Sequence, residues 1–246
     1  MPLTWDVGVA SDPGRLRETN EDTAFAGPTG ANGGALLLAV ADGLGGAPAG
    51  DVASTLAVAA LRESLDAENE PATEAALRAA MALANRRVHA AGQRPGRAGM
   101  GATVTAAAVA GERALLAHAG DCRAYLVNAA GARQLTTDHT WVAEQVRAGR
   151  LPPEAAAGHP SRHVVTRAVG SEPETPCDII ETAVSPGDTL VLCSDGLHGP
   201  VSGAEIAEVC RTVAATAQQA AEALVDMANR RGGADNITVI VAHASG

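Results

Sequence analysis

The sequence predicts an α+β fold in which helices pack on antiparallel β-sheets. Three largely apolar segments, 103–110, 113–119 and 122–128, follow one another with only two residues between neighbours. A crossover between parallel strands needs about a dozen residues or more, so we expect these segments to form an antiparallel meander. Segments with apolar residues at three- and four-residue spacing flank the meander and supply the helices.

Composition favours a single folded domain over residues 1–246. The chain is 46% apolar and 19% charged, with a formal net charge of −10, which is typical of a globular protein. Its 18 basic residues are all arginine, and alanine exceeds a fifth of the sequence. Aromatic residues make up only 2% of the chain, so we expect the core to rely on small residues and close backbone approach.

Charge and cysteine usage exclude several classes of protein. An acidic chain with a pI of about 5.1 lacks the clustered basic residues that nucleic-acid binding requires. The four cysteines form no C-x-x-C pair, which suits a reducing compartment and argues against a zinc or redox site. With no signal peptide at residues 1–9 and no apolar run long enough to cross a bilayer, we expect a cytoplasmic monomer without a membrane partner. Because the sequence ends directly after its last predicted strand, we expect neither a sensor domain nor a membrane anchor.

The part of the chain before the meander contains a strand and a helix pair. The run 36–41 is continuously apolar, as in a strand that is covered on both faces. Helices are predicted at 50–65 and 71–91 from their apolar spacing. Their short connection makes them antiparallel neighbours.

Residues 139–170 differ from the segments around them. They contain a short helix at 141–148, two adjacent prolines and a cluster with His159, Arg162 and His163, but no long apolar strand. Surface excursions of this length are usually functional lids or insertions. We therefore expect a flap at 139–170.

The last third of the chain predicts a strand pair, a helix pair and a final strand. Segments 177–184 and 188–194 flank a Ser-Pro-Gly turn, which predicts a second antiparallel pair. Helices are expected at 203–213 and 216–230, the first with Ser202 and Glu205 in the positions of a capping box. The apolar run 237–242 predicts the final buried strand.

Carboxylates lie at the ends of the predicted buried strands. They are Glu21, Asp22, Asp42, Asp121, Asp195 and Asp235. Each aspartate alone has an ordinary explanation, because Asp-Gly and Gly-Asp are common turn sequences. If several strand ends meet at one rim, however, the carboxylates repel one another unless a divalent cation holds them together.

The ligand types indicate which cations and which substrate suit such a site. Oxygen ligands without a nearby histidine or cysteine favour Mg²⁺ or Mn²⁺ over zinc. Two such cations about 3.5–4 Å apart form a hydrolytic site that generates hydroxide near neutral pH. Arg17 lies a few residues before Glu21, and a guanidinium suits a phosphoryl group. Taken alone, an arginine in such a loop is usually a solvated surface residue.

Six short motifs occur in a fixed order along nearly the whole chain. They are RETNED at 17–22, DGLGG at 42–46, GAT at 101–103, GDCR at 120–123, SDGL at 194–197 and DN at 235–236. In this order and spacing they resemble the motifs of the metal-dependent type 2C protein phosphatases, the PPM family, in their bacterial form. The resemblance implies a four-layer α-β-β-α sandwich, with two antiparallel sheets flanked by antiparallel helix pairs.

The resemblance also implies a metal-binding role for the matching residues. Asp42 is similar to the carboxylate that bridges two metals, and the Gly43 carbonyl to a ligand of one of them. Asp195 and Asp235 resemble ligands of the second metal. Asp121, together with Asp195, resembles the site of a weaker third metal found in bacterial members.

Glu21 and Asp22 resemble the acidic pair that holds metals directly or through water, and Arg17 resembles the phosphate-binding arginine. The implied cofactors are two Mn²⁺ or Mg²⁺ ions with a possible third. The implied reaction is hydrolysis of phosphoserine and phosphothreonine in proteins, by in-line attack of a metal-bridging hydroxide. Phosphorylated proteins, including Ser/Thr kinases, are the implied partners, and the 139–170 excursion corresponds to the family's mobile flap.

The chain departs from the family pattern at the expected general acid. Many members have a histidine within or just after the DGxGG motif, thought to protonate the leaving alkoxide, where this chain has Leu44 and Ala47. The acid is therefore unassigned, and the candidates His139, His159 and His163 also have structural or solvent-exposed explanations. Without an acid, aryl phosphates should be hydrolysed much better than alkyl phosphates.

Three functions are compatible with the sequence. The leading hypothesis is a Mn²⁺- or Mg²⁺-dependent protein-serine/threonine phosphatase that reverses kinase signalling. A degenerate phosphatase that binds phosphoproteins without turnover is supported by the missing histidine, but the retained carboxylates argue against it. A hydrolase of small phosphoesters is the third, because the flap sets the surface of the cleft.

Overall fold

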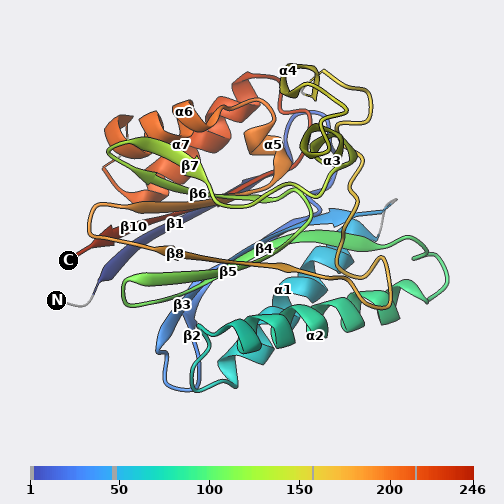
Figure 1. Ribbon diagram of the computed structural model, residues 1–246, viewed down its shortest axis with the longest axis horizontal. Helices are drawn as coiled ribbons and strands as arrows, with labels where there is room; N and C mark the ends of the chain where they lie inside the picture. The colour runs from blue at the N-terminus through green and yellow to red at the C-terminus, as the bar shows by residue number, and fades with distance from the viewer. Residues whose placement is uncertain (1–2, 46–48, 157, 214) are drawn as a thin grey trace.

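The computed structural model describes residues 3–45, 49–156, 158–213 and 215–246 and contains two five-stranded antiparallel sheets that face each other (Figure 1). The first sheet has the order β1 (Thr4–Asp12), β10 (Ile237–Ser245), β9 (Thr189–Cys193), β6 (Arg123–Asn128) and β7 (Gly131–Gln134). The second has the order β2 (Asp22–Thr29), β3 (Ala35–Leu44), β4 (Gly101–Ala110), β5 (Arg113–Ala119) and β8 (Asp178–Ala183).

Helices cover the outer face of each sheet. Helices α1 (Gly50–Asp66) and α2 (Glu74–Gly92) lie under the second sheet, and α6 (Gly203–Glu208) and α7 (Ala217–Arg230) lie over the first (Figure 1). A π-helical turn, Val209–Val213, continues α6. The predicted α+β fold with its α-β-β-α layers is confirmed, and all four predicted outer helices are present.

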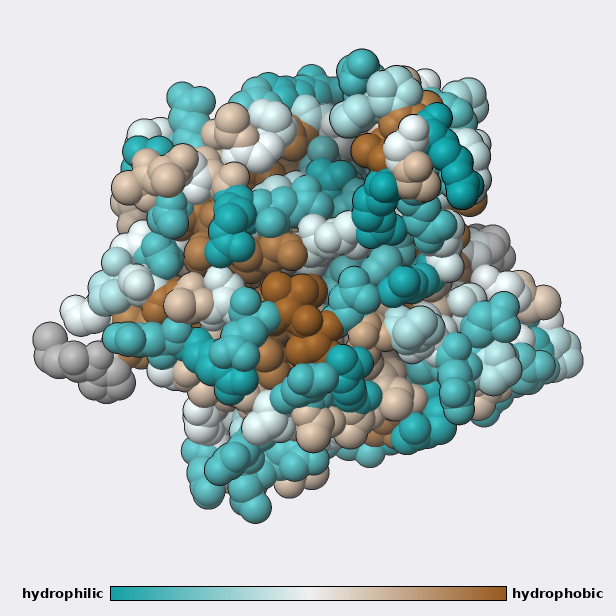
Figure 2. Space-filling model, viewed as in Figure 1, coloured by the Kyte–Doolittle hydropathy of each residue, from teal (hydrophilic) through white to brown (hydrophobic). Residues whose placement is uncertain are grey.

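The core relies on small residues, as the composition predicts. Ala53, Ala57 and Ala60 of α1 are fully buried in one cluster with Ala39 and Ala41 of β3. Methyl side chains let the helix approach the sheet closely, so that dispersion contacts compensate for the scarcity of aromatic rings. Figure 2 shows apolar side chains gathered in the opening between the two sheets, while much of the surrounding surface is hydrophilic.

Capping side chains start three of the four outer helices, and one of these caps was predicted from the sequence. The Ser202 hydroxyl accepts a hydrogen bond from the Glu205 backbone N–H while the Glu205 carboxylate accepts from the Ser202 N–H, which confirms the predicted capping box. The Thr73 hydroxyl caps α2 by accepting from the Ala76 N–H, and the Thr216 hydroxyl caps α7 by accepting from the Gln219 N–H. Within the described residues no helix is long and apolar enough to cross a membrane.

Two predicted strand pairings are wrong. The meander holds for β4 and β5, but β6 lies in the other sheet, and the predicted pair 177–184 and 188–194 is likewise divided between the sheets as β8 and β9. Gly120 has a φ of +115° where the chain changes sheets, and a Cβ there would lie 2.2 Å from the Thr103 Cβ. β6 and β9 are largely buried, so their apolar pattern does not say which neighbour they pair with, and β8 is a mostly half-buried strand at the edge of its sheet.

The 139–170 excursion forms its own small unit at one end of the sandwich, which we call the flap. It contains α3 (Trp141–Arg147) and α4 (Pro153–Ala156), so the predicted short helix at 141–148 is present. Two isolated bridges, Thr140 with Val165 and Ala102 with Val169, tie the flap to itself and to β4. Another short helix, α5 (Asp195–His198), follows β9 directly.

Candidate metal centre

Seven of the eight sequence-predicted site residues line one cavity of about 710 Å³. They are Arg17, Glu21, Asp42, Gly43, Asp121, Asp195 and Asp235. They come from the loop before β2, from β3, from the β5–β6 turn, from the start of α5 and from the loop before β10. The eighth, Asp22, does not line the cavity but lies directly opposite Asp42 in the β2–β3 ladder.

Close backbone contact fixes the end of β3 that carries Asp42. The Gly43 N–H donates to the Glu21 carbonyl at 3.2 Å. A Cβ at Gly43 would lie 2.1 Å from the Gly50 carbonyl oxygen at the start of α1. Only glycine therefore allows β3, the Glu21 loop and α1 to meet at this point.

Two buried polar residues that the sequence analysis left without a role hold these segments together. The Ser194 hydroxyl donates to Asp22 Oδ2 at 2.7 Å. Asn236 Oδ1 accepts from the Glu21 N–H at 2.8 Å, and its Nδ2 donates to the carbonyls of Pro13 and Thr19, each at 2.9 Å. Asn236 thereby joins the Arg17 loop to β10. Ser194 and Asn236 are each next in sequence to a predicted metal aspartate, and this was the sequence feature that could have identified them as part of the site.

Burial and mutual repulsion act on the carboxylates of this centre. Burial raises the pKa of Asp22 and of Asp121 to about 7, and the neighbouring Asp195 adds to both shifts. The pKa of Asp42 lies well above its ordinary value, first because of burial and then because of Asp22. The pKa of Asp195 is also raised, by burial and by Asp235. The centre therefore lacks positive charge.

Arg17 supplies part of that charge. Its Nη2 lies 2.8 Å from Asp235 Oδ2, in an ion pair that the sequence analysis did not predict. Both side chains are partly exposed, at 50% and 35%, so water screens the pair and its contribution to stability is small. The pairing places the guanidinium at the rim of the carboxylate cavity.

The residues present fit a hard divalent cation. Asp22 Oδ1 and Asp195 Oδ1 are buried, and neither has a hydrogen-bond partner in the described parts of the chain. Carboxylate and carbonyl oxygens are the ligands that Mg²⁺ and Mn²⁺ prefer. In the described parts of the chain, no three acidic, histidine or cysteine side chains lie close enough together to hold a metal ion as they stand. Carboxylates that repel one another are expected to stay apart in this way.

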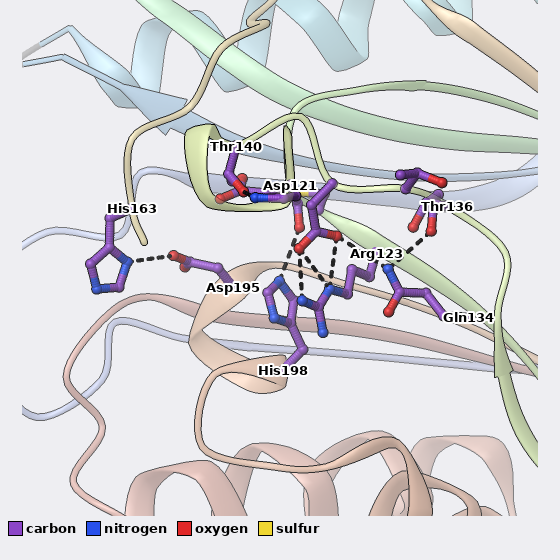
Figure 3. Close-up of polar contacts among 12 residues, drawn as sticks. Asp121, Arg123, Gln134, Thr136, Thr140, His163, Asp195 and His198 are labelled. Atoms are coloured by element: carbon purple, nitrogen blue, oxygen red, sulfur yellow. Dashed lines mark hydrogen bonds and ion pairs between the residues drawn. The ribbon is translucent and has the colours of Figure 1, made fainter. Parts of the chain in front are cut away.

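The three candidate histidines occupy different places. His139 is buried, accepts from the Gly120 N–H at 3.0 Å and does not line the cavity. His159 stacks on Trp141 at a centroid distance of 5.0 Å. His163 lines the cavity, with Nδ1 3.8 Å from Asp195 Oδ2 (Figure 3). Leu44 also lines the cavity, and Ala47 lies outside the described residues.

The fold and this centre together define a class of protein, the α-β-β-α sandwiches with a carboxylate centre at the ends of their sheets. The family model described as protein phosphatase 2C matches residues 17–229. This chain belongs to the protein phosphatase 2C family, which confirms the resemblance seen in the motifs.

Curated relatives and solved structures agree with that assignment. The chain is 42% identical over 244 residues to the serine/threonine protein phosphatase PstP of Mycobacterium tuberculosis, covering 98% of this chain and 45% of PstP. It therefore spans about half the length of this relative. It is 34% identical to the protein phosphatase PhpP of Streptococcus pneumoniae, covering 95% of each chain. A structure of the PstP catalytic domain in complex with two manganese ions has a TM-score of 0.87 at 37% identity, covering 99% of this chain and 100% of that one.

Proposed function

We propose that this chain is one catalytic domain that hydrolyses phosphoserine and phosphothreonine in proteins with the help of divalent cations. The observation that carries the proposal is the gathering of carboxylates from five segments, with Arg17 at the rim, in one cavity. The names of PstP and PhpP as protein phosphatases support the same substrate class. We further propose that the protein acts in the cytoplasm as a monomer, on phosphorylated proteins that include Ser/Thr kinases.

Seven residues of the centre would hold the cations. Asp42 and the Gly43 carbonyl, with Asp195 and Asp235, would hold two Mn²⁺ or Mg²⁺ ions, while Glu21 and Asp22 would act directly or through water. Asp121 would share a weaker third ion with Asp195. When bound, the cations supply an activated water and neutralise charge on the phosphoryl oxygens.

Asp22 and Arg17 have further roles in the centre. Asp22 lies behind Asp42 and accepts from Ser194, so it fixes the Asp42 end of β3 and adds negative charge to the centre. Arg17 binds the phosphoryl oxygens. For that its guanidinium turns from Asp235 toward the substrate, which the exposure of the pair allows.

A turnover assay tests this proposal. We expect p-nitrophenyl phosphate hydrolysis with Mn²⁺, its loss in EDTA, and its loss in Asp195→Ala. The matched control is Asp226→Ala, because Asp226 is exposed on α7 and does not line the cavity. If the protein shows no metal-dependent turnover, it is a phosphoprotein-binding module and not a phosphatase. Inhibition by nucleotides but not by a phosphothreonine peptide would indicate a small-molecule phosphoesterase.

A further inference from the structure

A second cavity of about 740 Å³ adjoins the metal centre. It lies between the β6–β7 side of the first sheet and the flap helices, where Figure 2 shows a recess on this face of the molecule. The two cavities share the residues Asp121, Arg162, His163, Asp195 and Gly199 in their linings. A peptide with its phosphorylated residue at the metal centre therefore has direct access to the second cavity.

The floor of the second cavity is electrically neutral. Arg123 Nε lies 2.9 Å from Asp138 Oδ1, and its Nη2 lies 2.7 Å from Asp138 Oδ2, a two-bond ion pair that is largely buried. Gln134 also donates to Asp138, at 3.1 Å, and Figure 3 shows Arg123 and Gln134 converging from β6 and β7. Asp138 thus neutralises the positive charge of Arg123, which is not available to a ligand in the cavity.

The wall and rim have a different character. Val142, Val146 and Pro153 of the flap helices form an apolar side. Arg147 on α3 and Arg162 in the flap are exposed, and neither is among the ion pairs of the described residues. Cations in the metal centre would balance Asp121 and Asp195, so the two arginines set the charge that a ligand meets here.

We propose that this cavity binds an anionic side chain of the phosphoprotein substrate, with Arg147 and Arg162 as specificity-determining residues. The inference rests on the proposed phosphatase function. Because the two cavities adjoin, the anionic residue lies among the residues that flank the phosphothreonine. It is a carboxylate or a second phosphate, because both are planar or branched oxygen anions that a guanidinium binds.

Peptide kinetics test the proposal. The probes are phosphothreonine peptides with alanine at all flanking positions, or with one glutamate moved through the flanking positions. We expect at least one glutamate position to raise kcat/KM about three- to fivefold over the alanine peptide, the range of an exposed ion pair. In Arg147→Glu that ratio should fall below one. Arg150→Glu is the matched control, because Arg150 is an exposed flap arginine that lines neither cavity.

A second set of peptides separates the two sources of negative charge. These peptides carry a non-hydrolysable phosphonate analogue of phosphoserine in place of the glutamate. Preference for both kinds of peptide, or for the phosphonate alone, supports the site and identifies its best ligand. The proposal is overturned if kcat/KM equals that of the alanine peptide for every glutamate and every phosphonate position. It is also overturned if Arg147→Glu and Arg150→Glu change this preference equally. Metal-dependent hydrolysis of the all-alanine phosphothreonine peptide in that case shows that the proposed function itself still stands.

Discussion

Asp42 is the side chain around which the other carboxylates are arranged. It faces Asp22 across the β2–β3 ladder, and Asp22, Asp195, Asp121 and Asp235 all raise its pKa after burial has done so. Four like charges near one buried carboxylate are costly without a counter-ion. The residues therefore stabilise a loaded centre and destabilise an empty one.

This repulsion predicts how the stability of the metal-free protein depends on pH. Asp22 and Asp121 have a pKa of about 7 when folded and near 3.8 when unfolded, so the folded state binds more protons between these values. The contribution of these two carboxyls to the free energy of unfolding is fully present below pH 3.8 and is lost as the pH rises through 7. In EDTA we expect the free energy of unfolding to fall by roughly 1 kcal/mol per carboxylate between pH 6.5 and pH 8.

The window starts at pH 6.5 because two histidines act in the opposite direction below it. Burial lowers the pKa of His118 and His198 to about 4, so their contribution is lost as the pH falls below 6.5. Urea unfolding in EDTA at several pH values is the measurement. Asp121→Asn should remove part of the fall, and a stability that rises from pH 6.5 to pH 8 contradicts the assignment.

Leu44 predicts a second property of the site, a steep dependence on the leaving group. Leu44 lines the cavity where a protonating side chain would be useful, and His163 is the only histidine among the described residues that does so. We expect kcat/KM to decrease sharply from aryl to alkyl phosphates as the leaving-group pKa rises. A flat series would show that an acid is present, with His163 as the residue to replace next.

At the scale of elements, apolar periodicity predicts whether a segment is a helix or a strand better than it predicts which strand lies beside it. The outer helices and the buried strands follow from apolar spacing, and the Ser202 cap follows from a local motif. Pairing of β6 and β9 does not follow, because both are apolar on both faces and a short connection, 120–122 or 184–188, can also lead to the opposite sheet. The strand β1 was missed because its exposure is mixed and its partner β10 lies at the other end of the chain.

The α6 cap gives a prediction at this scale. Ser202→Ala removes the acceptor for the Glu205 N–H and leaves the first turn of α6 unsatisfied. We expect the free energy of unfolding to fall by about 1 kcal/mol in a denaturant titration. Ser185→Ala is the control, because Ser185 is exposed and its hydroxyl makes no hydrogen bond within the described residues. An equal effect of both substitutions would contradict the role of the cap.

At the scale of the whole molecule, the fold gathers carboxylates that the sequence distributes over more than 200 residues. Seven of the eight site residues predicted from the sequence and its motifs line one cavity, because strand ends in one core meet at a common rim, while the metal ligands among them stay a prediction. The Arg17–Asp235 pair and the bonds of Asn236 were not predictable, because they join residues 218 and 215 positions apart through side-chain geometry. Much of the net charge of −10 is thus a cation site rather than a dispersed surface charge.

Calorimetric titration of Mn²⁺ into metal-free protein tests the central claim that these carboxylates form one cation centre. We expect about two ions to bind per chain, and Asp42→Asn to lose at least tenfold in affinity because it removes the shared ligand. Asp226→Asn should bind as the unchanged protein does. Absence of Mn²⁺ binding, or equal binding by Asp42→Asn and the unchanged protein, would contradict the account.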